Sequence, residues 1–119
     1  MIKMIYIAGP YRASNAWEIE QNIREAETYA LHIWRLGNTA VICPHANTRY
    51  FYGAAPDDLF IEGGLEILKR CDAIFMLPKW EQSEGSVEEK REAIRCSIPV
   101  FYSLYGLIEW LRPFRPNPV

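Results

Sequence analysis

The sequence predicts one α/β domain, a flavodoxin-like or Rossmann-like three-layer sandwich with a parallel sheet of four to five strands. The chain has 119 residues, which suits a single domain, and half of them are hydrophobic. Short apolar runs of strand type alternate along the chain with amphipathic helical patterns. This alternation is typical of a parallel sheet that is covered by helices on both faces.

The first predicted strand covers residues 4–8, a β-rich apolar run that is ended by a Gly-Pro pair at 9–10. A helix is predicted over 15–36, because apolar residues recur there at spacings of three and four. Either Ser14 or Asn15 can cap the start of this helix. Its predicted buried face comprises Ile19, Ile23, Ala26, Ala30 and Ile33.

A second strand is predicted over 39–43, where Pro44 closes it. The polar and aromatic segment 45–56 is predicted to be a loop. Two acidic residues at 57–58 can open a helix that reaches residue 70. The residues of this helix expected to face inward are Ile61, Leu65 and Leu68.

The rest of the chain contains, in order, a predicted strand at 73–77, a helix at 86–96, a strand at 99–102 and a terminal helix at 104–111. The last segment, 113–119, holds three prolines, and we expect it to be irregular. The predicted domain therefore spans residues 1–112. We favour a strand order in which the first and third strands are neighbours, which brings the loops after Ala8 and Leu77 together.

Composition excludes several classes of protein. The formal net charge is −2 and the isoelectric point is near 5.7, with no basic stripe, which argues against a general nucleic-acid binder but allows a local phosphate site. No apolar run is long enough for a membrane span, and the N-terminal run reads as a strand rather than a signal peptide. The three cysteines lack metal-site spacing, so we expect reduced thiols, no metal and a cytoplasmic protein.

The charged segment that follows the third strand contains one carboxylate unlike the others. Glu88, Arg91, Glu92 and Arg95 are spaced as solvent-exposed ion pairs on one helix. Glu89 instead has Ser86, Ala93 and Cys96 as its helical neighbours, which are small and suggest close packing against the sheet. Glu89 is therefore a candidate for chemistry in the cleft. The alternative is that Glu89 is only a partner of the helix dipole at the N-terminus, or half of a capping box with Ser86.

The turn Ser83–Ser86 precedes this helix and can hold an anion such as a phosphate. Gly85 permits a tight turn, and the serine hydroxyls and free N–H groups of the helix start are donors. A plain helix cap explains the same residues equally well.

The segment 6–12 supplies the facing wall of the predicted cleft. Gly9 and Pro10 end the strand, Gly9 allows close approach of a ligand, and Arg12 can bind a phosphate bidentately. Tyr6 lies within the strand, with a hydroxyl that can reach the strand end. Taken singly, these residues also suit a turn glycine, a surface arginine and a core tyrosine.

Polar and aromatic residues near the other strand ends are candidates for ligand contact. His45 and Asn47 follow the second strand, although a lone histidine in such a place is more often structural than catalytic. Several aromatic side chains can stack on a base or can simply close the core. They are Tyr11, Tyr50, Phe51, Tyr52 and Trp80.

Taken together, these segments resemble the nucleoside 2-deoxyribosyltransferase superfamily, most closely its small 2′-deoxynucleoside 5′-phosphate N-hydrolase-like members. The resemblance extends from Met4 to about Tyr102. It rests on Tyr-x-x-Gly at Tyr6 to Gly9, followed by Arg12, and on the spaced residues Ser83, Gly85 and Glu89. The segment CDAIFMLPKW is similar to the strand that leads into this loop in the family.

The resemblance implies a role for each matched residue. Glu89 would be the nucleophile that attacks C1′ of the deoxyribose, and Tyr6 would orient it. Ser83, Gly85 and Arg12 would lie where the hydrolases hold the 5′-phosphate, and His45 would line the site. The resemblance also implies a homodimer or higher homo-oligomer.

One position departs from the family pattern. The family usually has an aspartate eight residues before the acid at the entrance of the third strand, which here is Asp72, and the earlier position is Gly64. The resemblance implies that this aspartate protonates the leaving base, so a second carboxylate with that role is not where it is expected. Asp58 and Glu62 come from the same region, and we take Asp58 as the candidate.

The predicted function is cleavage or transfer at an N-glycosidic bond of a (deoxy)nucleoside or its 5′-monophosphate, with Glu89 as nucleophile and no cofactor. Ser86 would join Ser83 and Arg12 at the phosphate, and Tyr11 and Trp80 would contact the base. The alternative is a non-catalytic nucleotide-binding or sensing module that keeps the pocket, which the glycine at position 64 supports.

Overall fold

The computed structural model describes residues 1–114 and shows an α/β domain with a four-stranded parallel sheet. The strand order is β2-β1-β3-β4, so the predicted fold class and the pairing of the first strand with the third are confirmed. The strands are β1 (Lys3–Ala8), β2 (Thr39–Ile42), β3 (Ala73–Met76) and β4 (Val100–Phe101). Each lies at the predicted place, within one residue at either end.

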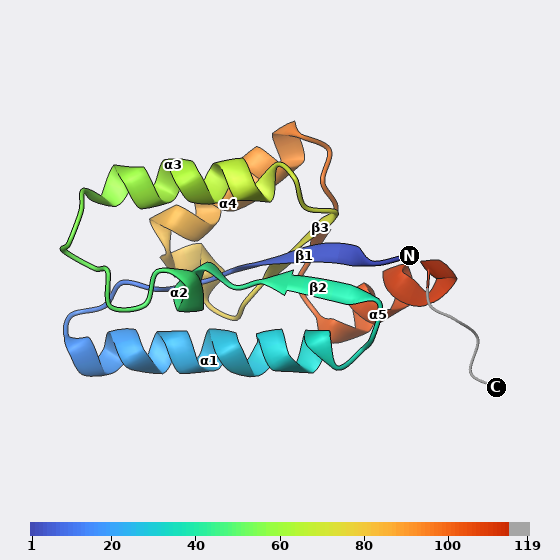
Figure 1. The fold of residues 1–119 in the computed structure, drawn as a ribbon, viewed down its shortest axis with the longest axis horizontal. Helices are drawn as coiled ribbons and strands as arrows, with labels where there is room; N and C mark the ends of the chain where they lie inside the picture. The colour runs from blue at the N-terminus through green and yellow to red at the C-terminus, as the bar shows by residue number, and fades with distance from the viewer. Residues whose placement is uncertain (115–119) are drawn as a thin grey trace.

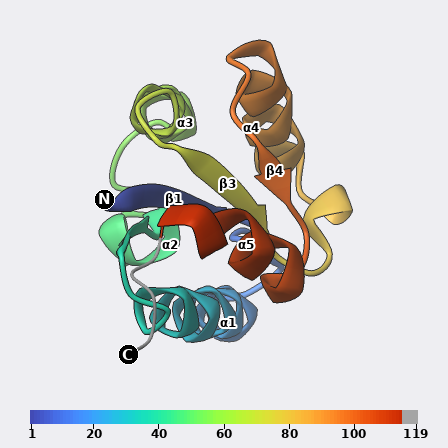
Figure 2. The same ribbon diagram turned by 90° about the vertical axis from the view of Figure 1, so that its right-hand side faces the viewer.

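The helices form the two outer layers of the sandwich. They are α1 (Ala16–Trp34), α2 (Pro44–Asn47), α3 (Asp57–Leu68), α4 (Glu84–Arg95) and α5 (Leu104–Leu111). Figures 1 and 2 show α1 and α5 on one face of the sheet and α3 and α4 on the other. Two 3₁₀ turns complete the described chain, at Trp80–Gln82 and Arg112–Phe114. Within residues 1–114, no helix combines the length and the apolar character that a bilayer span requires.

Each face of the sheet has its own hydrophobic core, because successive strand side chains point to opposite faces. Ile5 and Ile7 of β1 are fully buried against α1 and α5. Tyr6 and Ala8 point to the other face, where they pack with residues of α3 and α4 such as Leu68 and Ala93. The alternation within β1 therefore decides that Tyr6 faces α4.

Several boundaries differ from the sequence prediction, each for a local reason. The predicted loop 45–56 begins with the short helix α2, which Pro44 starts because its fixed φ suits the first helical turn. Ile61 is exposed instead of buried, since the first half of α3 stands over a cavity rather than over the sheet. Part of the predicted irregular tail forms the 3₁₀ turn Arg112–Phe114, and residues 115–119 lie outside the described chain.

The carboxyl ends of β1 and β3 lie side by side, as predicted. The backbone N–H of Leu77 donates to the carbonyl of Ala8 at 2.8 Å. A Cβ atom on Gly9 would lie 2.5 Å from the nearest atom of the Leu77 side chain, so only glycine fits there. The loops that leave these two strands therefore begin in contact with each other.

Candidate active site

A cavity of about 700 Å³ opens at the carboxyl ends of the first three strands. Its lining comes from residues within four segments, 6–12, 44–52, 57–67 and 82–89. The first, second and fourth segments follow β1, β2 and β3, and the third is most of α3. This is the place where open parallel sheets bind ligands, and the volume suits a small organic molecule.

A tyrosine and a glutamate meet at the wall of the cavity that the sheet and α4 provide. The Tyr6 hydroxyl donates a hydrogen bond to the Glu89 carboxylate. Ser86 and Ala93, one turn before and after Glu89 on α4, are fully buried against the sheet. The same helical face therefore directs Glu89 toward β1, as the spacing predicts.

Burial controls the ionisation of this pair. It raises the pKa of Glu89 from 4.5 to about 7, while the hydrogen bond from Tyr6 acts in the opposite direction. Burial, followed by the nearby Glu89 charge, raises the pKa of Tyr6 well above 10. Tyr6 therefore remains a protonated donor, and Glu89 exchanges its proton near neutral pH.

The capping alternative for Glu89 is wrong. Ser83 is the N-cap of α4, and its Oγ accepts from the backbone N–H of Ser86 at 3.2 Å. The helix thus begins at Glu84, two residues earlier than predicted, which places Glu89 in the second turn, out of reach of the cap. Since the Ser86 hydroxyl also donates to Ser83 Oγ at 3.0 Å, both predicted phosphate-binding serines already have partners within the protein.

Arg12 also has a partner at the cavity. Its Nη2 lies 2.9 Å from Oδ2 of Asp57, the first residue of α3, and both side chains line the cavity. They are about half exposed, at 54% and 45%. The ion pair joins the loop after β1 to the start of α3.

His45 is buried and lines the cavity, but its ring is hydrogen-bonded to the backbone of the loop after β1. Nε2 lies 3.1 Å from the carbonyl of Gly9 and 3.0 Å from that of Pro10. Because both partners are acceptors, Nε2 carries the proton and donates to them. Burial lowers the pKa of His45, which keeps the ring neutral, and its Nδ1 has no hydrogen-bond partner among the described residues. His45 therefore fixes the loop after β1.

The aromatic candidates divide into two groups. Tyr11, Phe51 and Tyr52 line the cavity, and the rings of Tyr11 and Tyr52 meet edge to face at 6.4 Å. Tyr50 is exposed outside the lining. Trp80, predicted to contact the base, also lies outside it, since its ring packs against Tyr102 and under the Lys90 ammonium.

The structure places the expected acid away from the cavity. Neither Asp58 nor Glu62 lines it, whereas the neighbouring Asp57 does. Helical spacing explains the error, because adjacent residues of α3 lie about 100° apart around its axis. Gly64 lies beside the Tyr6–Glu89 pair, and a Cβ atom there would lie only 3.0 Å from the Tyr6 hydroxyl. The other predicted lining residues, Asn47 and Gly85, are in place.

Sequence reasoning did not single out Asp57, Glu84, Gln82 or Phe60 as lining residues. The position of Asp57 could have been predicted. An acidic residue at the start of a helix that begins near the strand ends is expected to lie close to an arginine in a loop there, here Arg12. Gln82 and Phe60 carried none, since their side chains enter the cavity only through the tertiary arrangement of the 3₁₀ turn and α3.

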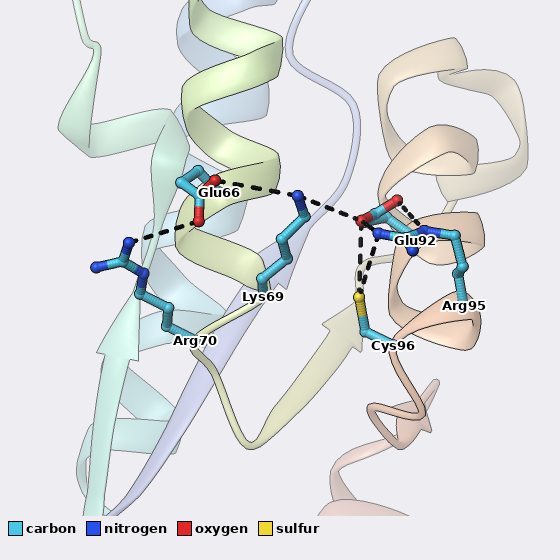
Figure 3. A network of polar contacts seen from close by, with 6 residues as sticks. All are labelled: Glu66, Lys69, Arg70, Glu92, Arg95 and Cys96. Atoms are coloured by element: carbon cyan, nitrogen blue, oxygen red, sulfur yellow. Dashed lines mark hydrogen bonds and ion pairs between the residues drawn. The ribbon is translucent and has the colours of Figure 1, made fainter.

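The remaining charges of α4 form the predicted surface ion pairs. Arg91 pairs with Glu88, and Arg95 Nε donates to Glu92 at 3.0 Å. Figure 3 shows the continuation of this network, in which Lys69, the residue that follows α3, lies between Glu66 and Glu92. The contact between Lys69 Nζ and Glu92, at 3.9 Å, connects the end of α3 to the last turn of α4. These charges lie outside the cavity except for Glu88, which also lines it.

The cavity has no ready metal site. Across residues 1–114, no group of three or more His, Cys, Asp or Glu side chains is placed to hold a metal ion. The polar groups that do converge are a tyrosine–glutamate pair and an arginine–aspartate pair.

The fold and the site define an α/β protein with a Rossmann-like parallel sheet, a strand-end cavity and a partly buried tyrosine–glutamate pair. The chain belongs to the family described as a domain of unknown function (DUF7768), which matches residues 3–103. That match covers all four strands and the whole cavity lining. Among curated proteins, none matches the chain.

Proposed function

We propose that the protein cleaves or transfers the N-glycosidic bond of a (deoxy)nucleoside or its 5′-monophosphate, with Glu89 as the nucleophile. The resemblance to nucleoside 2-deoxyribosyltransferases supports this proposal, because Tyr6, Gly9, Arg12, Ser83, Gly85 and Glu89 match the motifs of that superfamily. Four of these residues, Tyr6, Gly9, Arg12 and Glu89, meet at one cavity with the turn that carries the other two.

One observation carries the proposal: the hydrogen bond from Tyr6 to Glu89 inside the cavity. A partly buried carboxylate without a cationic partner destabilises the fold when it is ionised, and such groups are concentrated at functional sites. Among the described residues, no lysine or arginine pairs with Glu89, and its donor is a neutral hydroxyl. A neutral donor fixes the carboxylate and leaves it nucleophilic, whereas a salt bridge would lower its basicity.

The chemistry takes two steps. In the first, a Glu89 oxygen bonds to C1′ while the C1′–N bond breaks, and the electron pair of that bond leaves with the base. In the second, water or another base attacks C1′, the ester to Glu89 breaks, and the carboxylate is restored. Water transfers its oxygen to the sugar and releases a proton, which yields hydrolysis. Division into two displacements is the advantage of a covalent intermediate.

Protonation of the leaving base has no dedicated residue in this arrangement. Asp58 is not proposed for it, because the structure places this residue outside the cavity lining. The aspartate of the superfamily corresponds to Gly64, which has no side chain. The proton is therefore taken from solvent through the open mouth of the cavity, and bases that leave readily are the favoured substrates. General acids typically contribute about 10²–10⁴-fold in rate, so we expect slow turnover.

A second candidate function is a nucleotide-binding or sensing module that does not react. The glycine at position 64 favours this function, because the aspartate that the superfamily usually has there is absent. The cavity and its aromatic wall are nevertheless present. This function would be identified if the protein binds nucleosides tightly but releases no free base from any substrate tested.

We also propose that the chain forms a homo-oligomer. Large apolar side chains are exposed around the mouth of the cavity, and such patches commonly mark contact surfaces. They are Tyr50, Phe51, Tyr52, Leu59 and Ile61, each at least 40% exposed. Light scattering after size exclusion tests this, since a monomer mass at micromolar concentration contradicts it.

The function is tested by release of free base from a panel of deoxynucleosides and their 5′-monophosphates. We expect wild-type protein to release base and Glu89→Ala to release none. Glu92→Ala is the matched control, because it removes a carboxylate of the same helix that is outside the cavity. Equal activity of the wild type and Glu89→Ala would contradict the assignment.

A further inference from the structure

The positive charge that Arg12 brings to the cavity is already paired with a carboxylate of the protein. Among the described residues that line it, Arg12 is the one lysine or arginine, and its guanidinium lies 2.9 Å from the carboxylate of Asp57. The partners belong to different segments, the loop after β1 and the first turn of α3. A ligand anion must therefore displace Asp57 or share Arg12 with it.

The rest of the lining adds negative charge. Besides Asp57, three more acidic side chains, Glu84, Glu88 and Glu89, face the same cavity as this single guanidinium. Glu84 lies in the first turn of α4, where its carboxylate competes for the positive end of the helix dipole. Ser86 is engaged within the cap, since its backbone N–H and its hydroxyl both donate to Ser83 Oγ.

A phosphate monoester carries about −1.5 to −2 charges at neutral pH and needs strong donors or cations to leave water. An anion was expected at two places, but at Arg12 the cation is already paired with Asp57, and at the start of α4 the carboxylate of Glu84 repels an anion. An uncharged nucleoside meets no such barrier, and the planar aromatic ring of its base suits the aromatic wall formed by Tyr11, Phe51 and Tyr52.

We propose that Asp57 is a specificity-determining residue which, by pairing with Arg12, excludes phosphorylated ligands so that the cavity takes uncharged nucleosides. This inference rests on the proposed function and narrows its substrate class. Exclusion of a competing ligand by a like charge is a common way to obtain specificity. Arg12 and Asp57 are about half exposed, so solvent screens their charges. The change in binding free energy caused by Asp57 is therefore expected to be as small as that of an exposed ion pair.

The test compares a deoxynucleoside with its 5′-monophosphate by titration calorimetry on the full chain. We expect the wild type to bind the nucleoside more tightly. Asp57→Asn should raise affinity for the monophosphate about two- to fivefold, which is the effect of roughly 0.4–1 kcal/mol, and should change affinity for the nucleoside much less. The selective gain should shrink as salt is added, because it is electrostatic.

Asp58→Asn is the matched control. It removes an identical charge from the same first turn of α3, but Asp58 does not line the cavity. A loss of helix stability would affect both variants alike, and only loss of the Asp57 pair should change the preference between ligands.

Two results would overturn the inference in distinguishable ways. Tighter binding of the monophosphate by the wild type, or equal effects of the two variants, removes the role of Asp57 and leaves the proposed function standing. Failure of the wild type to bind either ligand removes both the proposed function and this assignment.

Discussion

The hydroxyl of Tyr6 and the carboxylate of Glu89, 83 positions apart in the chain, share a hydrogen bond that joins β1 to α4 inside the cavity. Neither residue is unusual alone, since a strand tyrosine and a helix glutamate are common. Their pairing within a cavity at the carboxyl ends of the strands is what indicates chemistry. The properties of this pair lead to most of the predictions below.

Tyr6→Phe should raise the pKa of Glu89 further, because the hydrogen bond from Tyr6 is what lowers it against the effect of burial. Less of the Glu89 carboxylate is then ionised at neutral pH, so base release should fall by about tenfold or more near pH 7 and recover partly at higher pH. The pH–rate profile measures this shift. Tyr105→Phe, which removes a hydroxyl from an exposed side chain outside the cavity, should leave the profile unchanged.

Glu89 should make the fold less stable as pH rises. Its pKa is about 7 in the folded protein and near 4.5 when unfolded, so the folded state holds the proton more tightly. The free energy of unfolding therefore falls between about pH 4.5 and pH 7 and then levels off. Because Glu89 keeps some access to the cavity, the loss should be about 1–3 kcal/mol, below the full value of the shift.

Glu89→Gln removes this penalty, so it should be more stable than the wild type at pH 8 and nearly equal to it at pH 4. Urea unfolding at the two pH values measures the difference. Glu88→Gln, which changes an exposed ion pair, should alter stability by only a few tenths of a kcal/mol at either pH. A Glu89→Gln variant that is destabilised at pH 8 would show that the carboxylate is structural.

Gly63 and Gly64 of α3 allow a paired test of whether a side chain fits in the space beside Tyr6. A Cβ at Gly63 would meet nothing within 4 Å, whereas one at Gly64 would lie 3.0 Å from the Tyr6 hydroxyl. Gly63→Ala should therefore stabilise the protein by about 0.5–1 kcal/mol, as alanine does inside helices. Gly64→Ala should lose most of that gain. Equal stabilisation in thermal melts would mean that position 64 tolerates a side chain.

Much of this fold could be predicted because its strands and helices are determined by patterns within short segments of the sequence. The alternation of apolar runs and helical periods determines the strands, and right-handed crossovers leave few orders for them. Asn15 caps α1 through the backbone N–H of Glu18 at 2.9 Å, which was one of the two expected choices. The start of α4 was misplaced because Ser83 and Ser86 are both good caps, and only the tertiary structure selects between them.

The site could be predicted in outline for the same reason, since strand ends meet at one edge of the sheet. The errors concern side chains whose direction depends on packing. Trp80 turns away because Tyr102 and Lys90 hold its ring, and Asp58 is displaced by one helical position from the cavity. Gly9 was expected to admit a ligand, but contact with Leu77 already requires a glycine there.

The central claim, that Glu89 is a nucleophile, is tested most directly by trapping the intermediate. A 2-deoxy-2-fluoro nucleoside with a readily leaving base should form a glycosyl ester that is slow to hydrolyse, because the fluorine disfavours the positive charge of the second step. Intact-mass and peptide mass spectrometry should place one glycosyl group on Glu89 in the wild type and in Glu92→Ala, and none on Glu89→Ala. An adduct on any other residue, or an equal adduct on Glu89→Ala, would contradict the claim.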